Sequence, residues 1–152
     1  MLGSIGVRFM IGGDETHDGG FSLVEHPMPP RTLAAPLHRH SREDEYSFVL
    51  EGRMGALLGD QEVHAEVGDL VFKPREEWHT FWNAGDEPCR ILEIISPAGF
   101  ERYFEELVDL EGAGRLEPSV VPRIAARYGL EADPGSIPGL CEKYGLTFGQ
   151  TP

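Results

Sequence analysis

Short apolar segments separated by Gly, Pro and Asp fill the first two thirds of the chain, up to residue 98. These segments are IGVRFMI, GFSLVEH, YSFVLEG, MGALL, EVHAEV, LVF, HTFW and CRILEII. Many short segments with frequent turn residues are typical of the strands of a β-sandwich or β-barrel. The pairs Gly59-Asp60 and Gly68-Asp69 are predicted to form tight turns between neighbouring strands.

The hydrophobic pattern becomes helical after residue 98. Apolar residues then recur at i, i+3, i+4, i+7 and i+8, which marks one face of an amphipathic helix. The residues on this face are Phe100, Tyr103, Phe104, Leu107 and Val108. A second helix is predicted to begin at Ser119 as its N-cap and to stop at Gly129. A third, shorter helix is predicted from about Ser136 to Tyr144, with Gly145 as its cap.

These patterns predict an all-β domain over residues 1–98 and a C-terminal α-helical extension over residues 99–152. The whole chain has 152 residues, which is enough for one well-packed core. The extension is too short to form a large core of its own, so we expect it to pack on the β domain or on a second subunit. Because aromatic residues at Phe100, Tyr103 and Phe104 need to be covered, the sequence predicts a homodimer.

Net charge and composition exclude several classes of partner. The formal charge is −13, and a strongly acidic chain repels nucleic acid and anionic lipid. No stretch approaches the 18 apolar residues of a membrane span, and the N-terminus lacks the pattern of a signal peptide. Cys89 and Cys141 lie far apart and outside any C-x-x-C pattern, which suits a reducing cytosol. We therefore expect a cytoplasmic protein with a small-molecule substrate, no nucleic-acid partner and no membrane.

Three histidines and one glutamate form a candidate metal site. His38 and His40 stand two residues apart on a predicted strand, so their side chains point to the same face. Glu45 follows once the chain has turned into the next strand, and His79 lies far along in PREEWHTFWN. Three imidazoles and one carboxylate suit a first-row transition metal. On an ion that accepts six ligands they leave up to two positions for water, substrate or oxygen.

The remaining histidines and acids near this site are interpreted without a functional role. His17 lies in a loop, His26 stands at a strand end before a proline, and His64 is predicted to face solvent. Glu43 and Asp44 are interpreted as solvated acids, which leaves Glu45 as the ligand by its spacing.

The spacing of these residues resembles the first motif of the cupin superfamily, G-x5-H-x-H-x(3,4)-E-x6-G. His38, His40, Glu45 and Gly52 occupy its positions, whereas Thr32 stands where the motif begins with Gly. The second motif, G-x5-P-x-G-x2-H-x3-N, is matched in a later segment. Its matching residues are Gly68, Pro74, His79 and Asn83, and Glu76 replaces its middle Gly. Both departures fall on turn positions and leave the four ligand positions filled.

The resemblance covers about residues 20–98. It implies a jelly-roll β-barrel that holds one divalent transition metal, whether Fe, Mn, Ni, Zn or Cu, on His38, His40, Glu45 and His79. Around the metal we expect apolar and aromatic walls, with strand alternation deciding which residues point inward. The candidates are Phe48, Leu50, Phe72, Trp78, Phe81 and Trp82. More loosely, PAGFERYFEEL after the barrel resembles small bacterial cupins described as quercetin dioxygenase-like.

Three classes of function remain open. The first is a metal-dependent dioxygenase acting on a flavonol-like or diketone substrate, with Glu45 as both ligand and catalytic proton acceptor. The second is an isomerase or lyase in which the metal polarises a carbonyl group. The third is a binding or sensing module without turnover. Cupins carry out many chemistries, so the fold does not choose among these classes.

Overall fold

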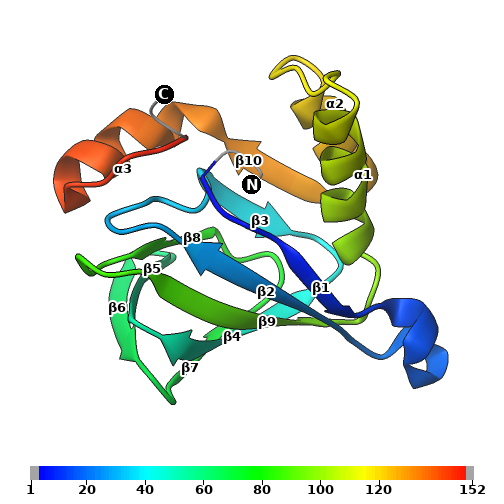
Figure 1. The fold of residues 1–152 in the computed structure, drawn as a ribbon, viewed down its shortest axis with the longest axis horizontal. Helices are drawn as coiled ribbons and strands as arrows, with labels where there is room; N and C mark the ends of the chain where they lie inside the picture. Colours follow the sequence, from blue (N-terminus) through cyan, green and yellow to red (C-terminus); the bar gives the residue numbers. More distant parts are fainter. Residues whose placement is uncertain (1–3, 150–152) are drawn as a thin grey trace.

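The computed structural model describes residues 4–149, which form two five-stranded antiparallel sheets and a C-terminal segment above them (Figure 1). The first sheet has the order β1 (Arg8–Ile11), β2 (Ser22–Met28), β9 (Cys89–Ser96), β4 (Asp44–Glu51) and β7 (Leu70–Lys73). The second sheet has the order β10 (Leu130–Asp133), β3 (Leu37–His40), β8 (His79–Asn83), β5 (Arg53–Leu58) and β6 (Gln61–Glu66). This arrangement confirms the predicted jelly-roll barrel with a C-terminal extension.

Strand alternation decides which side chains enter the space between the sheets. On β4 the residues at alternate positions, Glu45, Ser47 and Val49, are buried, while the intervening ones are half-buried on the outer face. The main apolar core between the sheets is formed by Met28, Val49, Met54, Ala56, Val71, Phe81 and Ile91, among others. The interior is therefore apolar in one part and charged in another, next to Glu45.

The expected aromatic walls are largely absent from the interior. Phe48 and Leu50 lie on the outer face of β4, and Phe72 on β7 is 48% exposed. Trp82 stacks on Tyr144 of the C-terminal segment, with ring centroids 4.3 Å apart. Only Phe81 of the six candidates belongs to the main core. On β4 the prediction failed because strand alternation turns Phe48 and Leu50 outward and Glu45, Ser47 and Val49 inward.

The C-terminal segment contains three helices and one strand that was not predicted. The helices are α1 (Glu101–Gly112), α2 (Val121–Arg127) and α3 (Ile137–Tyr144). Gly145 caps α3 with a φ of 64°, as expected. The N-cap of α2 is Val120 rather than Ser119, and no side chain caps the helix. After α2, residues Leu130–Asp133 form strand β10, which pairs antiparallel with β3. The sequence analysis expected only helices in this part of the chain.

The C-terminal helices cover their own barrel. Phe100 and Tyr103 are 3% and 9% exposed, and they pack with Val24 and Ile95 from the first sheet. The face that motivated the predicted homodimer is thus covered within the chain. The homodimer remains a prediction, to be checked by sedimentation at micromolar concentration. None of the helices in residues 4–149 is long and apolar enough to cross a membrane.

Candidate metal centre

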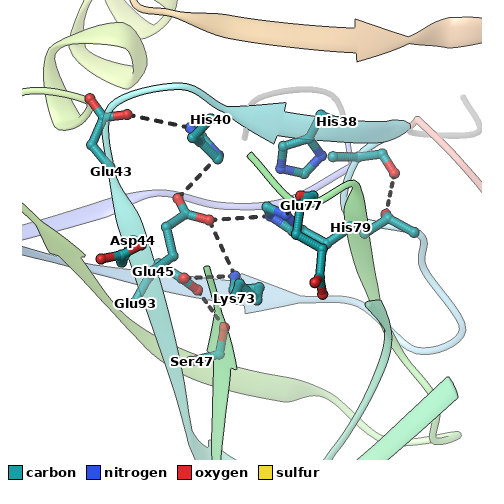
Figure 2. Close-up of polar contacts among 12 residues, drawn as sticks. His38, His40, Glu43, Asp44, Glu45, Ser47, Lys73, Glu77, His79 and Glu93 are labelled. Atoms are coloured by element: carbon teal, nitrogen blue, oxygen red, sulfur yellow. Dashed lines mark hydrogen bonds and ion pairs between the residues drawn. The ribbon is translucent and has the colours of Figure 1, made fainter. Parts of the chain in front are cut away.

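The structure brings the four predicted ligands together between the two sheets. His38 and His40 come from β3, His79 comes from the neighbouring β8, and Glu45 comes from β4 of the opposite sheet. Their potential ligand atoms all lie within 4.8 Å of one another, and all four side chains are buried (Figure 2). The register explains the match, because His38 pairs directly with His79 across the β3–β8 ladder.

Backbone contacts orient two of the imidazoles. Nδ1 of His38 lies 2.8 Å from the Pro36 carbonyl oxygen, and Nδ1 of His79 lies 3.1 Å from the Glu77 carbonyl oxygen. A carbonyl oxygen only accepts, so each Nδ1 carries a proton, and in the neutral ring Nε2 keeps the lone pair that binds a metal. Such an outer hydrogen bond is the usual way to fix the ring of a metal-binding histidine.

The atoms that face the centre of the cluster lack hydrogen-bond partners. Nε2 of His40 and Nε2 of His79 are buried and make no hydrogen bond within the described part of the chain. Each lies 3.4 Å from a different oxygen of Glu45. Buried polar atoms are rarely left unsatisfied in proteins, and a cation bound between them would satisfy all three groups. The residues present therefore fit a divalent metal.

The protonation states suit metal binding. Burial lowers the pKa of His38 well below its usual value and that of His40 to about 4, so both rings are neutral at pH 7. Burial alone would raise the pKa of Glu45, but the nearby His40, Lys73 and His79 outweigh it and hold that pKa well below its usual value. Neutral imidazole and ionised carboxylate are the forms that bind a metal.

Glu43 is buried, which contradicts its interpretation as a solvated acid. Its side chain is 5% exposed, and its Oε2 atom lies 3.8 Å from Nδ1 of His40. Neither atom makes a hydrogen bond among residues 4–149. Burial raises the pKa of Glu43 to about 7. By contrast, the Asp44 side chain is 26% exposed on the outer face of β4 and pairs with Arg75.

The position of Glu43 predicts an effect on metal affinity. A metal on Nε2 leaves His40 with a proton on Nδ1, and Glu43 offers an acceptor at this side of the ring. Glu43→Ala is expected to weaken Zn²⁺ binding by about 10–100-fold, the usual cost of losing an outer partner of a ligand. Glu43→Gln retains an acceptor oxygen and is expected to lose less. Chelator competition measures both, and equal affinities of Glu43→Ala and wild type would contradict this role.

A second set of polar residues adjoins the site and was missed by the sequence analysis. Lys73 on β7, Glu93 on β9 and Ser47 on β4 are all buried beside Glu45 (Figure 2). Strand alternation carried the signal, since Lys73 stands two residues after the inward-facing Val71, and Ser47 two residues after Glu45. A lysine at the end of a short strand nevertheless looks like a solvent-facing residue.

The other histidines lie outside the cluster. His17 is exposed, and His64 faces solvent beside Glu62, as predicted. His26 is 2% exposed, donates from Nδ1 to the Gly6 carbonyl oxygen at 3.0 Å, and packs edge-on against Phe104. It is thus a satisfied core residue.

The buried His26 is expected to make the folded state less stable in acid, independently of the metal ligands. Burial lowers its pKa from 6.5 to about 4, so between these values the unfolded chain binds a proton that the folded chain does not. The neutral, buried His26 stabilises the folded state above pH 6.5. As the pH falls towards 4, the free energy of unfolding is expected to decrease by about 3 kcal/mol in total.

Urea unfolding of the chelator-treated protein at pH 7 and pH 4.5 checks this expectation. His26→Asn keeps a donor for Gly6 but does not titrate, so its stability is expected to fall less between the two pH values. An equal fall in His26→Asn and wild type would assign the acid sensitivity to other groups.

The two departures from the cupin motifs have different consequences. Glu76 adopts a left-handed conformation with φ of 67°, the geometry for which the motif uses Gly. Its backbone amide still donates to the His40 carbonyl oxygen at 2.8 Å and so ties this turn to β3. The backbone φ of Thr32 is not positive, so a threonine fits this position without backbone strain. The turns that carry the ligands are therefore preserved.

The fold and the site define a small double-sheet β-barrel protein with histidines and acids in its interior. Residues 25–95 match the family model of the cupin domain, so this segment of the chain is a cupin domain. The tetracenomycin polyketide synthase protein TcmJ of Streptomyces glaucescens is 32% identical over 60 residues, which are 40% of this chain and 40% of TcmJ. The matched region thus spans well under half of that relative.

Two solved structures show the same fold at low sequence identity. A predicted oxalate decarboxylase from Thermotoga maritima is 22% identical with a TM-score of 0.57, covering 61% of this chain and 80% of that one. The DMSP lyase DddQ from Ruegeria pomeroyi is 22% identical with a TM-score of 0.51, covering 61% of this chain and 47% of that one. These likenesses support the cupin fold and do not single out the quercetin dioxygenase-like subtype.

Proposed function

We propose that this protein is a metal-dependent enzyme that acts on a small organic substrate. His38, His40, Glu45 and His79 would hold one divalent transition metal, whether Fe, Mn, Ni, Zn or Cu. The observation that carries the proposal is the buried set of four donors within 4.8 Å, in which two imidazole nitrogens lack hydrogen bonds. When bound, a metal of this kind supplies a Lewis acid that polarises a substrate oxygen and, if redox-active, a site for oxygen chemistry.

The residues around the site would exclude water and handle a proton. Phe100 packs edge-on against His40, with ring centroids 4.4 Å apart, and so shields this side of the cluster. Glu45 is the carboxylate within the cluster and is the candidate acceptor of a substrate proton. The charged Lys73 beside Glu45 favours the ionised carboxylate, which is the form that can accept a proton.

The reaction we propose first is a dioxygenation of a substrate that becomes electron-rich when it loses a proton. The interior side chains next to Glu45, namely Ser47, Lys73 and Glu93, are polar, which favours a small, oxygen-rich diketone over a bulky flavonol. The similarity to TcmJ supports the same choice, since polyketides are built from alternating carbonyl and methylene groups.

An isomerase or lyase is the second candidate, favoured by one feature of the site. The ionised Glu45 would remove a proton next to a substrate carbonyl group polarised by the bound metal, without any redox step. A non-catalytic binding module would use the same donors to hold a ligand without turnover.

Oxygen consumption separates these functions. The Fe-, Mn- and Ni-loaded forms of the protein are incubated with diketones, flavonols and catechols. Oxygen uptake and product formation are measured in parallel. Metal-dependent uptake supports the dioxygenase. Turnover of a carbonyl compound under nitrogen supports the isomerase or lyase instead. Tight ligand binding with no turnover under either condition would leave the binding module.

A further inference from the structure

A row of charged side chains extends from the candidate metal centre into the barrel. Nζ of Lys73 lies 2.6 Å from Oε1 of Glu93 and 3.5 Å from Oε2 of Glu45. Ser47 donates from its hydroxyl group to Oε2 of Glu93 at 2.6 Å. Figure 2 shows these residues in succession from His40 through Glu45 and Lys73 to Ser47. The side chain of Lys73 is 0% exposed, so its charge is balanced entirely inside the protein.

The register of three strands produces this row. Glu45 pairs with Lys73 across the β4–β7 ladder, and Ser47 pairs with Glu93 across the β4–β9 ladder. Glu45 and Ser47 are two residues apart on the central strand and so point to the same interior face. The ring of Phe81, 4.5 Å below Nζ, closes the apolar side of Lys73.

Stability alone does not account for a buried lysine between two acids. Taking such charges out of water is costly, and well-packed apolar residues of similar size are often as stable or more so. A carboxylate that must point at a metal has a different requirement. Its terminal torsion is soft, so an isolated Glu45 would sample several orientations. A fixed cation beside one oxygen of the Glu45 carboxylate restricts these orientations.

We propose that Lys73, itself held by Glu93, whose carboxylate accepts a hydrogen bond from Ser47, is a positioning residue that orients the Glu45 carboxylate for metal binding. Lys73 contacts Oε2 of Glu45, while Oε1 faces Nε2 of His40. This inference rests on the metal centre proposed above. It assigns a role in metal affinity to Lys73, Glu93 and Ser47, three residues that the cupin motifs do not specify. The row of charged side chains then belongs to the metal centre rather than to the core.

Two variants that differ only at position 73 test the proposal. Glu93→Gln keeps the Lys73 ammonium and an acceptor oxygen for it. Lys73→Met/Glu93→Gln removes the cation together with its main counter-charge, which avoids an unpaired buried Glu93. Zn²⁺ and Mn²⁺ affinities are measured by chelator competition, and urea unfolding of the metal-free proteins reports their folding.

The double variant is expected to fold and to bind both metals about 10–100-fold more weakly than Glu93→Gln, as for the loss of an outer partner of a ligand. The electron paramagnetic resonance spectrum of bound Mn²⁺ should also broaden, because the carboxylate is less uniformly placed. A folded double variant with the affinity and spectrum of Glu93→Gln would overturn the proposal and leave Lys73 as a buried counter-charge.

Ser47→Ala provides a second test if the double variant does not fold. It deletes one hydroxyl group and keeps all three charges, so it is expected to weaken metal binding in the same direction by a smaller factor. An unchanged affinity in Ser47→Ala would then overturn the proposal. Wild-type protein is titrated alongside, and a wild type that binds neither metal would overturn the metal centre itself, a result distinct from a change between variants.

Discussion

Replacing His79 by alanine is expected to remove most of the metal from the purified protein. His79 is 1% exposed and stands opposite His38 in the β3–β8 ladder, so no other side chain of the described structure can take its place in the cluster without moving a strand. Losing a ligand should cost more than the roughly 10–100-fold in affinity that losing an outer partner costs. Metal analysis of untagged protein and chelator competition measure the loss.

Matched histidine variants separate this effect from a general loss of histidine. His17→Ala and His64→Ala change exposed residues, and both are expected to retain the wild-type metal content. Because His79→Ala also leaves a buried cavity, urea unfolding of the metal-free protein must show that the variant is folded. A folded His79→Ala with the metal content of the wild type would show that the cluster is not the metal site.

Glu45→Gln is expected to abolish most turnover while the protein stays folded. If Glu45 is both ligand and proton acceptor, its replacement by an amide of the same size removes the base, which alone is worth about 10²–10⁴-fold in rate. Three histidines remain, so part of the metal is expected to be retained. Initial rates with the substrate identified by the oxygen-uptake experiment, corrected for bound metal, measure the effect.

The row of charged side chains around Lys73 makes Glu45→Gln an informative variant. Lys73 contacts two acids in the wild type, and the substitution leaves it paired with Glu93 alone at 2.6 Å. The metal-free variant therefore keeps a neutral buried pair, and we expect it to be at least as resistant to urea as the wild type. A rate per bound metal within a few-fold of wild type would exclude Glu45 as the base and favour a purely ligating role.

The amino-acid sequence by itself determined the elements whose signals are local. Alternation and turn residues predicted the strands, and Gly145 predicted the end of α3, where φ is 64°. The spacing of His38, His40, Glu45 and His79 predicted a cluster that the structure assembles. Such predictions succeed because side-chain direction on a strand follows from a two-residue repeat, and because motif turns require particular residues.

Other features depended on contacts between distant segments, which only the tertiary structure decided. Glu43 lies in the acidic run REDE, which looks solvated, yet in the fold its side chain is buried beside His40. Residues 130–133 follow a helix and become a strand because β3 offers them an edge. Lys73 and Glu93 lie on strands that meet only through β4, which stands between them in the first sheet. A lysine side chain is rarely buried without acidic partners. Here only the pairing of the strands places those acids beside it.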